Sequence, residues 1–218
     1  MRQHILVEGQ NDFHVILNLW TVLGLNSVKD YNKNKFPVVA NGKENIPLKI
    51  AELLASSDVE NIGIVVDADV SAQNTWQSIR SELEKHGFDN LPKQLPKVGI
   101  IIKKVGFPKV SVWIMPNNQE PLMENNVAYL EHFYALLIKT DDKYLLKANQ
   151  VVEDIAEDEE RRFSLTHLQK AKIHTWLAWQ ANPGSAMGQT IKDKGLFDLD
   201  NELAQTFKKW LEGTFDFE

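Results

Sequence analysis

The feature that most constrains this chain is a nearly continuous apolar run, Asn61–Val66 (NIGIVV), which ends in Asp67-Ala68-Asp69. Such a run is typical of a strand buried on both faces, and strands of this kind occur in parallel sheets that helices cover. Carboxylates directly after the strand lie at the edge where open parallel sheets bind ligands. The sequence therefore predicts a parallel sheet with acidic side chains at its carboxyl edge.

The rest of the first half alternates between strand and helix patterns. Short apolar runs predict strands, and apolar side chains at helical spacing predict helices. In chain order we expect a strand at 4–7, a helix at 11–24, a strand at 36–40, a helix at 46–56, a strand at 61–66 and a helix at 71–86. Two short apolar runs follow, at 98–105 and 110–115, and they form either a hairpin or two edge strands. This order predicts an α/β fold with a central, mainly parallel sheet, helices on both faces and right-handed crossovers.

The second half of the chain has the pattern of helices alone. We expect helices at 124–138, 144–157, 164–181 and 199–213, with a flexible turn around 182–188. We therefore divide the chain into an α/β domain over residues 1–121 and a helical C-terminal extension over residues 122–218 that packs on it. Trp176, Trp179 and Trp210 are expected to form the core of the extension.

Composition narrows the class of protein. The 218 residues include no cysteine, which excludes disulfides, iron–sulfur clusters and thiolate zinc sites. There is no apolar run of about 18 residues and no pattern of a secretory signal at the start, so we expect no membrane association and a cytoplasmic protein. The net charge of -6 argues mildly against a long basic groove for nucleic acid, but it is compatible with phosphate binding through metal ions.

Four carboxylates are expected to share one crevice. Glu8 ends the first strand, Asp12 lies in the first turn of the following helix, and Asp67 and Asp69 end the third strand. Carboxylates this close repel one another in a partly dry pocket, and a hard cation removes the repulsion. The pattern predicts a Mg²⁺ or Mn²⁺ site with one or two ions, in which Glu8 is either a metal ligand or a general acid or base.

Each of these assignments has a plainer alternative. Asp12 and Asp69 could each do no more than cap the helix that follows. Lys43, after the second strand, either neutralises developing phosphate charge or is a surface lysine at a helix start. Four histidines lack a second ligand at metal-binding spacing, and structural roles are favoured for them: His4, His14, His167 and His174.

At the acidic positions the sequence resembles the TOPRIM family, whose domain is shared by topoisomerases, bacterial primases and overcoming-lysogenization-defect nucleases. The pattern is Glu-Gly after the first strand and Asp-X-Asp after the third, here Glu8-Gly9 and Asp67-Ala68-Asp69. The spacing from Glu8 to Asp12 is similar to the first acidic motif of the overcoming-lysogenization-defect nucleases. Residues 113–117 (WIMPN) and 172–180 (KIHTWLAWQ) resemble stand-alone TOPRIM-like proteins of the DUF3226 type, which extends the resemblance over almost the whole chain.

The resemblance implies a Rossmann-like fold of about four parallel strands and Mg²⁺-dependent chemistry at a phosphodiester. It implies that Glu8 is the acid/base residue or a metal ligand and that Asp67 and Asp69 hold metal. The chain departs from the DUF3226 type at residues 121–124 (PLME), where that group tends to have Gly two residues before a Leu-Glu pair. Glu124 is then either a further metal ligand or a solvated residue near a helix start. No Tyr has the context of a topoisomerase nucleophile.

Two functions follow as hypotheses. The first is a Mg²⁺-dependent nuclease, or a related phosphodiester-transfer enzyme, that acts on DNA or RNA through Glu8, Asp12, Asp67 and Asp69. The second is a non-catalytic module that binds a nucleotide, a nucleic-acid end or a protein partner such as an ATPase within a larger complex. The negative net charge favours the second. The oligomeric state is left open.

Overall fold

A central sheet positions everything else in the molecule. The computed structural model describes residues 2–28, 32, 36–119 and 127–217. Its described strands form one five-stranded sheet in the order β2-β1-β3-β5-β4. The strands are β1 (Arg2–Val7), β2 (Pro37–Val39), β3 (Val59–Asp67), β4 (Ile100–Ile102) and β5 (Lys109–Met115). β2, β1, β3 and β5 are parallel, whereas β4 pairs with β5 in the antiparallel sense at the edge, so the hairpin alternative is correct.

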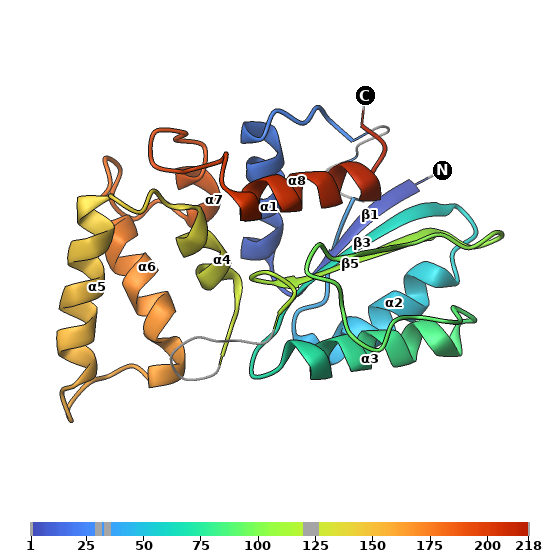
Figure 1. Cartoon of the computed structure of the whole chain (residues 1–218), viewed down its shortest axis with the longest axis horizontal. Coiled ribbons are helices and arrows are strands. Elements are labelled where there is room, and N and C mark those ends of the chain that lie inside the picture. Colours follow the sequence, from blue (N-terminus) through green and yellow to red (C-terminus); the bar gives the residue numbers. More distant parts are fainter. Residues whose placement is uncertain (1, 29–31, 33–35, 120–126, 218) are drawn as a thin grey trace.

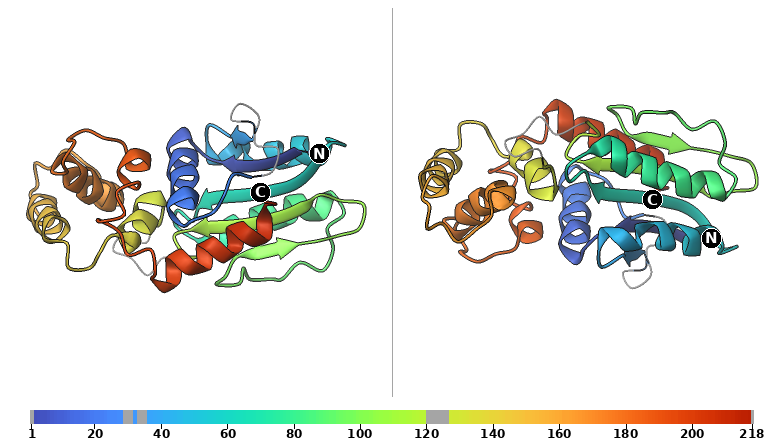
Figure 2. Two further views of the ribbon diagram at one scale, coloured as in Figure 1. Left: turned by 90° about the horizontal axis from the view of Figure 1, so that it is seen from above. Right: turned by 90° about the horizontal axis from the view of Figure 1, so that it is seen from below.

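Helices cover both faces of this sheet, which confirms the predicted α/β fold (Figures 1 and 2). α2 (Ile46–Leu54) and α3 (Ala72–Lys85) cover one face. α1 (Gln10–Val22) and α8 (Glu202–Thr214) cover the other. Cover on both faces is the reason that β3 is buried at seven of its nine positions and carries an unbroken apolar run.

The remaining helices lie beyond the carboxyl edge of the sheet (Figure 1). They are α4 (Leu130–Leu137), α5 (Lys143–Ala156), α6 (Leu168–Ala178) with a 3₁₀ turn at Leu165–His167 before it, and the short α7 (Met187–Thr190). α7 begins within the stretch expected to be a flexible turn, at residues 187–188, and continues to Thr190. No helix among the described residues is long and apolar enough to span a bilayer.

Two of the three tryptophans expected in the core of the helical part are buried. Trp176 is fully buried and Trp210 nearly so, but Trp179 is 39% exposed, so that prediction was wrong. The reason is local: Trp179 is the residue after the last turn of α6, where the helix ends, and it leaves the buried face. The buried cluster on the α1 side continues from sheet residues such as Trp113 to Trp176, so the helical part and the sheet share one core.

The end of the chain returns to the sheet. After α8, the Phe215 ring packs beside Gly63 of β3 and 5.2 Å from the Phe36 ring. The Asp216 backbone N–H donates to Gln3 Oε1 at 2.8 Å, and Phe217 pairs with Val28 in an isolated bridge. The predicted division at residue 121 stays a prediction. The second part helps to cover one face of the sheet in the first part, so the two parts share a core.

Candidate functional site

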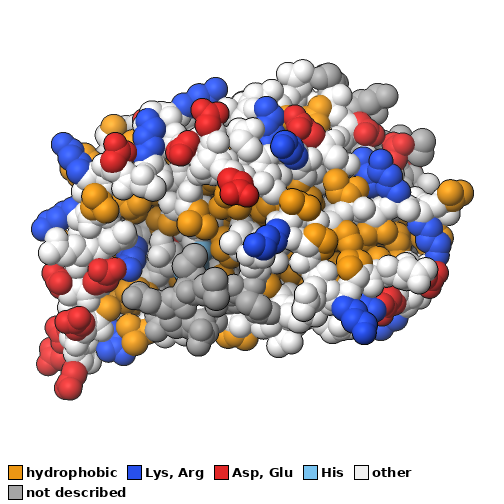
Figure 3. All heavy atoms as spheres, in the orientation of Figure 1, with side chains coloured by type: hydrophobic (Ala, Val, Ile, Leu, Met, Phe, Trp, Pro, Cys, Tyr) orange, Lys and Arg blue, Asp and Glu red, His pale blue; other side chains and the backbone are white. Residues whose placement is uncertain are grey.

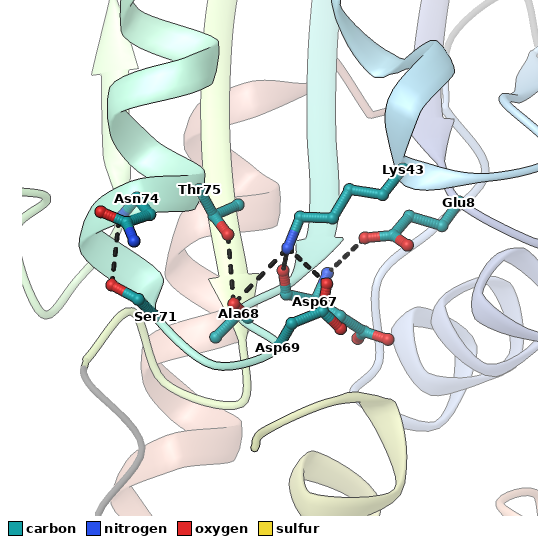
Figure 4. Close-up of polar contacts among 8 residues, drawn as sticks. All are labelled: Glu8, Lys43, Asp67, Ala68, Asp69, Ser71, Asn74 and Thr75. Carbon is teal, nitrogen blue, oxygen red and sulfur yellow. Dashed lines mark hydrogen bonds and ion pairs between the residues drawn. The ribbon is translucent and has the colours of Figure 1, made fainter. Parts of the chain in front are cut away.

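The strand order brings Glu8 and Asp67 to one place. β1 and β3 are parallel neighbours with Val7 opposite Val65, so the residues that follow emerge at the same edge. Glu8 Oε1 accepts a hydrogen bond from the Asp67 backbone N–H at 2.8 Å. Figure 4 shows the side chains of Glu8, Lys43, Asp67 and Asp69 gathered at this edge. The two strand-end acids therefore meet as the parallel sheet predicts.

Asp12 does cap its helix. Its Oδ2 accepts a hydrogen bond from the Gly9 backbone N–H at 2.6 Å, at the point where α1 begins. Its charge nevertheless belongs to the same cluster, because it raises the pKa of both Glu8 and Asp67. The capping role and the electrostatic role thus occur together.

Asp69 does not cap the helix that follows it. Ser71 takes that role, since its hydroxyl accepts the Asn74 N–H. The Asp69 backbone has φ 50°, in the left-handed region, and its half-exposed side chain accepts from Lys43 Nζ at 2.7 Å. Lys43 Nζ also donates to the Asp67 carbonyl oxygen at 3.0 Å. Lys43 therefore lies inside the acidic cluster and is not an isolated surface lysine.

Burial raises the pKa of three of the carboxyls. It raises the pKa of Asp12 to about 6 and that of Asp67 well above its ordinary value, where the charges of Asp12 and Glu8 add to the effect. Burial also raises the pKa of Glu8, against the opposing charge of Lys43. Three ionised carboxylates in one partly dry site repel one another, so the site favours a compensating proton or cation.

Sequence reasoning missed three residues that the helical part adds to this site. Glu131 of α4 is buried, and its charge raises the pKa of Asp12 and of Asp67. Two basic side chains of α6 face it: Lys170 Nζ lies 3.8 Å and His174 Nε2 lies 3.9 Å from Glu131 Oε1. In the sequence Glu131 lies in the middle of the helix expected at 124–138, and nothing there places α4 and α6 over the sheet edge.

Backbone and side-chain hydrogen bonds fix these helices against the edge. Asp69 and Ala128 exchange two backbone hydrogen bonds, both of 2.8 Å. The Tyr129 hydroxyl donates to the Thr166 carbonyl oxygen at 3.0 Å and accepts from the Lys170 N–H at 3.3 Å. Burial raises the pKa of Tyr129 to about 12. Tyr129 is therefore a neutral link between α4 and α6 and not a nucleophile.

The acidic side chains of the cluster would bind a metal ion through carboxylate oxygens, which are the ligand atoms that hard divalent cations prefer. One oxygen of each of Glu8, Asp12 and Asp69 already accepts a hydrogen bond. Across the described ranges, no three acidic or histidine side chains are arranged to hold an ion by themselves. Glu124, the possible further ligand, lies outside the described residues. The residues fit an ion that also takes ligands from phosphate and water, which is how proteins commonly bind Mg²⁺.

Comparison with known proteins gives one match. Residues 2–216 match the family described as "Protein of unknown function (DUF3226)". A TOPRIM family model is not matched. No curated protein and no solved structure matches the chain. Because the match covers nearly the whole chain, this chain belongs to the DUF3226 family, which is described as a family of unknown function.

Proposed function

We propose that this protein is a Mg²⁺- or Mn²⁺-dependent nuclease, or a related phosphodiester-transfer enzyme, with the acidic cluster as its active site. The observation that carries the proposal is that Glu8, Asp12 and Asp67 lie together at the carboxyl edge of a parallel sheet with raised pKa values. A divalent ion shared with a phosphodiester would remove the repulsion that raises them. The resemblance of these positions to the TOPRIM pattern supports the same reading.

Each residue has a distinct task in this proposal. Asp67 would hold the ion, with Asp69 and Asp12 at its sides, and Glu8 would be either a further ligand or the general acid or base. The ion would activate water and neutralise charge on the phosphate. Glu8 is fixed in orientation by the Asp67 N–H, which suits it to take a proton from water or to give one to the leaving oxygen. Lys43 Nζ, 2.7 Å from Asp69, would stabilise the charge that develops on phosphate oxygens.

The test is a cleavage assay with labelled single- and double-stranded DNA and RNA, in Mg²⁺, in Mn²⁺ and in a chelator. We expect cleavage that needs the ion and that falls by a factor of about a hundred or more in Asp67→Asn, as for the loss of a group that acts in the transition state. Asp58→Asn is the matched control, because Asp58 lies just before the opposite end of the same strand and is exposed. If Asp67→Asn still cleaves as the parent chain does, the acidic cluster is not the active site.

The second candidate function is a non-catalytic module that binds a nucleotide, a nucleic-acid end or a protein partner such as an ATPase. The net charge of -6 favours it. On the face in Figure 3 the described Lys and Arg side chains are interspersed with Asp and Glu and form no basic groove. Calorimetry with Mg²⁺ and nucleotides, together with the cleavage assay, separates the two functions. Binding without turnover of any polynucleotide would favour the module.

A further inference from the structure

A small pocket opens between α1, α6 and α7, beside the acidic cluster. It has a volume of about 160 Å³. Its lining combines two imidazoles and two carboxamides with an apolar thioether, and these side chains are Asn11, His14, His174, Gln189 and Met187. The two histidines are 160 positions apart in the sequence, and structural roles were favoured for both. The fold instead brings them to one cavity.

One chain neighbour and one contact place this pocket next to the carboxylates. Asn11 directly precedes Asp12 in the first turn of α1. On the other side, His174 Nε2 lies 3.9 Å from Glu131 Oε1, and the charge of Glu131 acts on both Asp12 and Asp67. A molecule in the pocket would therefore adjoin whatever the acidic cluster holds.

The pocket is held in shape by tight packing. A Cβ atom on Gly188 would lie 3.0 Å from the His14 backbone, which is closer than most Cβ contacts, so α7 packs tightly on α1 at this glycine. The Tyr134 hydroxyl donates to the Met187 carbonyl oxygen at 3.1 Å and anchors α7 from behind. The space between His14 and His174 thus exists before any ligand arrives.

The size and chemistry of the lining select one class of ligand. Pockets for drug-sized molecules have volumes of roughly 300–1,000 Å³, so this one suits a single ring system. Carboxamides such as Asn11 and Gln189 carry both a donor and an acceptor, which match the edges of nucleobases. Imidazole rings stack on unpaired bases.

Two other occupants fit less well. An anion such as phosphate would meet the charge of Glu131 beside His174. A metal ion would need a third ligand, and the described residues hold no group of three acidic or histidine side chains suited to one.

We propose that this pocket binds the base of an unpaired nucleotide adjacent to the phosphodiester at the acidic cluster. The inference rests on the proposed function in one respect, which is that the base belongs to a nucleic-acid substrate. In this proposal the helical part of the chain recognises the base of the substrate, because α6 and α7 supply His174, Met187 and Gln189. It also implies a substrate that is single-stranded, or frayed, at the site of reaction, since a paired base is stacked and cannot enter.

The test measures nucleoside binding and not cleavage. The four common nucleosides, which carry no phosphate for the metal-free carboxylates to repel, are titrated into the full chain by calorimetry or by NMR, in a chelator so that no metal contributes. We expect binding with a preference among the bases. His174→Ala and Gln189→Leu should each weaken it by at least about fivefold, the lower range for loss of a stacking partner. Ala186→Leu, which adds bulk to the pocket lining, should abolish it.

The variants change exposed side chains, so they are expected to fold like the parent, which circular dichroism checks. His167→Ala is the matched control, because His167 is exposed and does not line the pocket. Failure of the parent chain to bind any of the four nucleosides in the millimolar range would overturn the proposal. So would affinities that are equal in the parent chain and in the three pocket variants.

The outcomes separate this inference from the proposed function. If His174→Ala weakens nucleoside binding but the protein cuts no polynucleotide, the pocket stands and catalysis is rejected. If Asp67→Asn abolishes ion-dependent cleavage while nucleoside affinity ignores His174 and Gln189, catalysis stands and the pocket is rejected.

Discussion

At the scale of single residues, the acidic cluster gives the folded protein an electrostatic penalty that depends on pH. The carboxyls of Glu8, Asp12 and Asp67 have raised pKa values in the folded state, so the folded state holds more protons than the unfolded state just above the ordinary carboxyl pKa. Where the folded state holds more protons, the free energy of unfolding falls as pH rises. The cluster therefore opposes folding at neutral pH unless a cation is present.

Asp12→Asn tests this penalty. The pKa of Asp12 rises from 3.8 to about 6 on folding, so its part of the penalty develops between about pH 4 and pH 6 and is complete above that window. In a chelator, the variant should be more stable than the parent at pH 7 by on the order of 2 kcal/mol, with little difference at pH 4. Urea unfolding at the two pH values measures it. Parallel pH profiles for the two proteins would contradict the prediction.

Divalent ions should offset the same repulsion. Saturating Mg²⁺ at pH 7.5 should raise the free energy of unfolding by about 3 kcal/mol at a concentration near a hundred times the dissociation constant. The thermal midpoint, measured by scanning fluorimetry with and without Mg²⁺, reports the change. The increase should be lost in Asp67→Asn and kept in Asp58→Asn. An equal increase in both variants would place the ion elsewhere.

Lys43 is expected to act on the reaction more than on the fold. It ion-pairs with the half-exposed Asp69, an arrangement that adds little to stability. If Lys43 stabilises phosphate charge, Lys43→Met should lower kcat by roughly a hundredfold. The urea midpoint should stay close to that of the parent chain, and Lys43→Arg should restore part of the rate. An unchanged kcat in Lys43→Met would return Lys43 to the role of a surface lysine.

The sequence predicts some members of the site and not others for a physical reason. Glu8 and Asp67 follow buried strands, and parallel strands of known order place their ends together without any further information. The position of Glu131 depends on how α4 packs against the edge, and that of His174 on how α6 packs against α4. These packing angles depend on many side chains at once, so no local pattern encodes them.

At the scale of elements, periodicity predicted most helices and strands to within a few residues. It placed the start of α4 too early, because the described residues 127–129 are not helical and α4 begins at Leu130. It failed at α7, whose four residues make one turn and show no repeat. The sequence pattern also did not predict where two elements approach each other closely, because such approaches depend on the absence of a side chain. Gly63 is the clearest case: a Cβ atom there would lie 2.6 Å from the Phe215 ring. The end of the chain can lie on β3 only because that position carries no side chain.

Gly63→Val should therefore lower the free energy of unfolding by about 1–3 kcal/mol, the usual range for overpacking a core. Urea unfolding of Gly63→Val, Phe215→Leu and the double variant forms a thermodynamic cycle. If the clash is the cause, the double variant should lose clearly less stability than the sum of the single losses. Additive losses would show that the two residues do not interact.

At the scale of the whole molecule, the charge distribution sets how nucleic acid can bind. The chain carries a net charge of -6, and the cations placed at the site are Lys43 and Lys170. Affinity for a single-stranded oligonucleotide falls with salt by a log–log slope of about -0.7 for each phosphate that cations neutralise. We expect a slope between about -1 and -2 from fluorescence anisotropy in Ca²⁺ or in a chelator. A slope steeper than about -4 would indicate a basic surface that the site does not include.

The return of the last residues to the sheet has a consequence for the order of folding. The face of the sheet under α2 and α3 is closed by segments between residues 37 and 115, which are near one another in the chain. The opposite face needs Phe207, Trp210 and Phe215 to reach strands that begin at residue 2. Contacts of such long sequence separation form slowly. During synthesis, the part of this face that α8 and Phe215 cover therefore stays exposed until α8 has left the ribosome, and in that interval chaperones can bind it and nascent chains can aggregate.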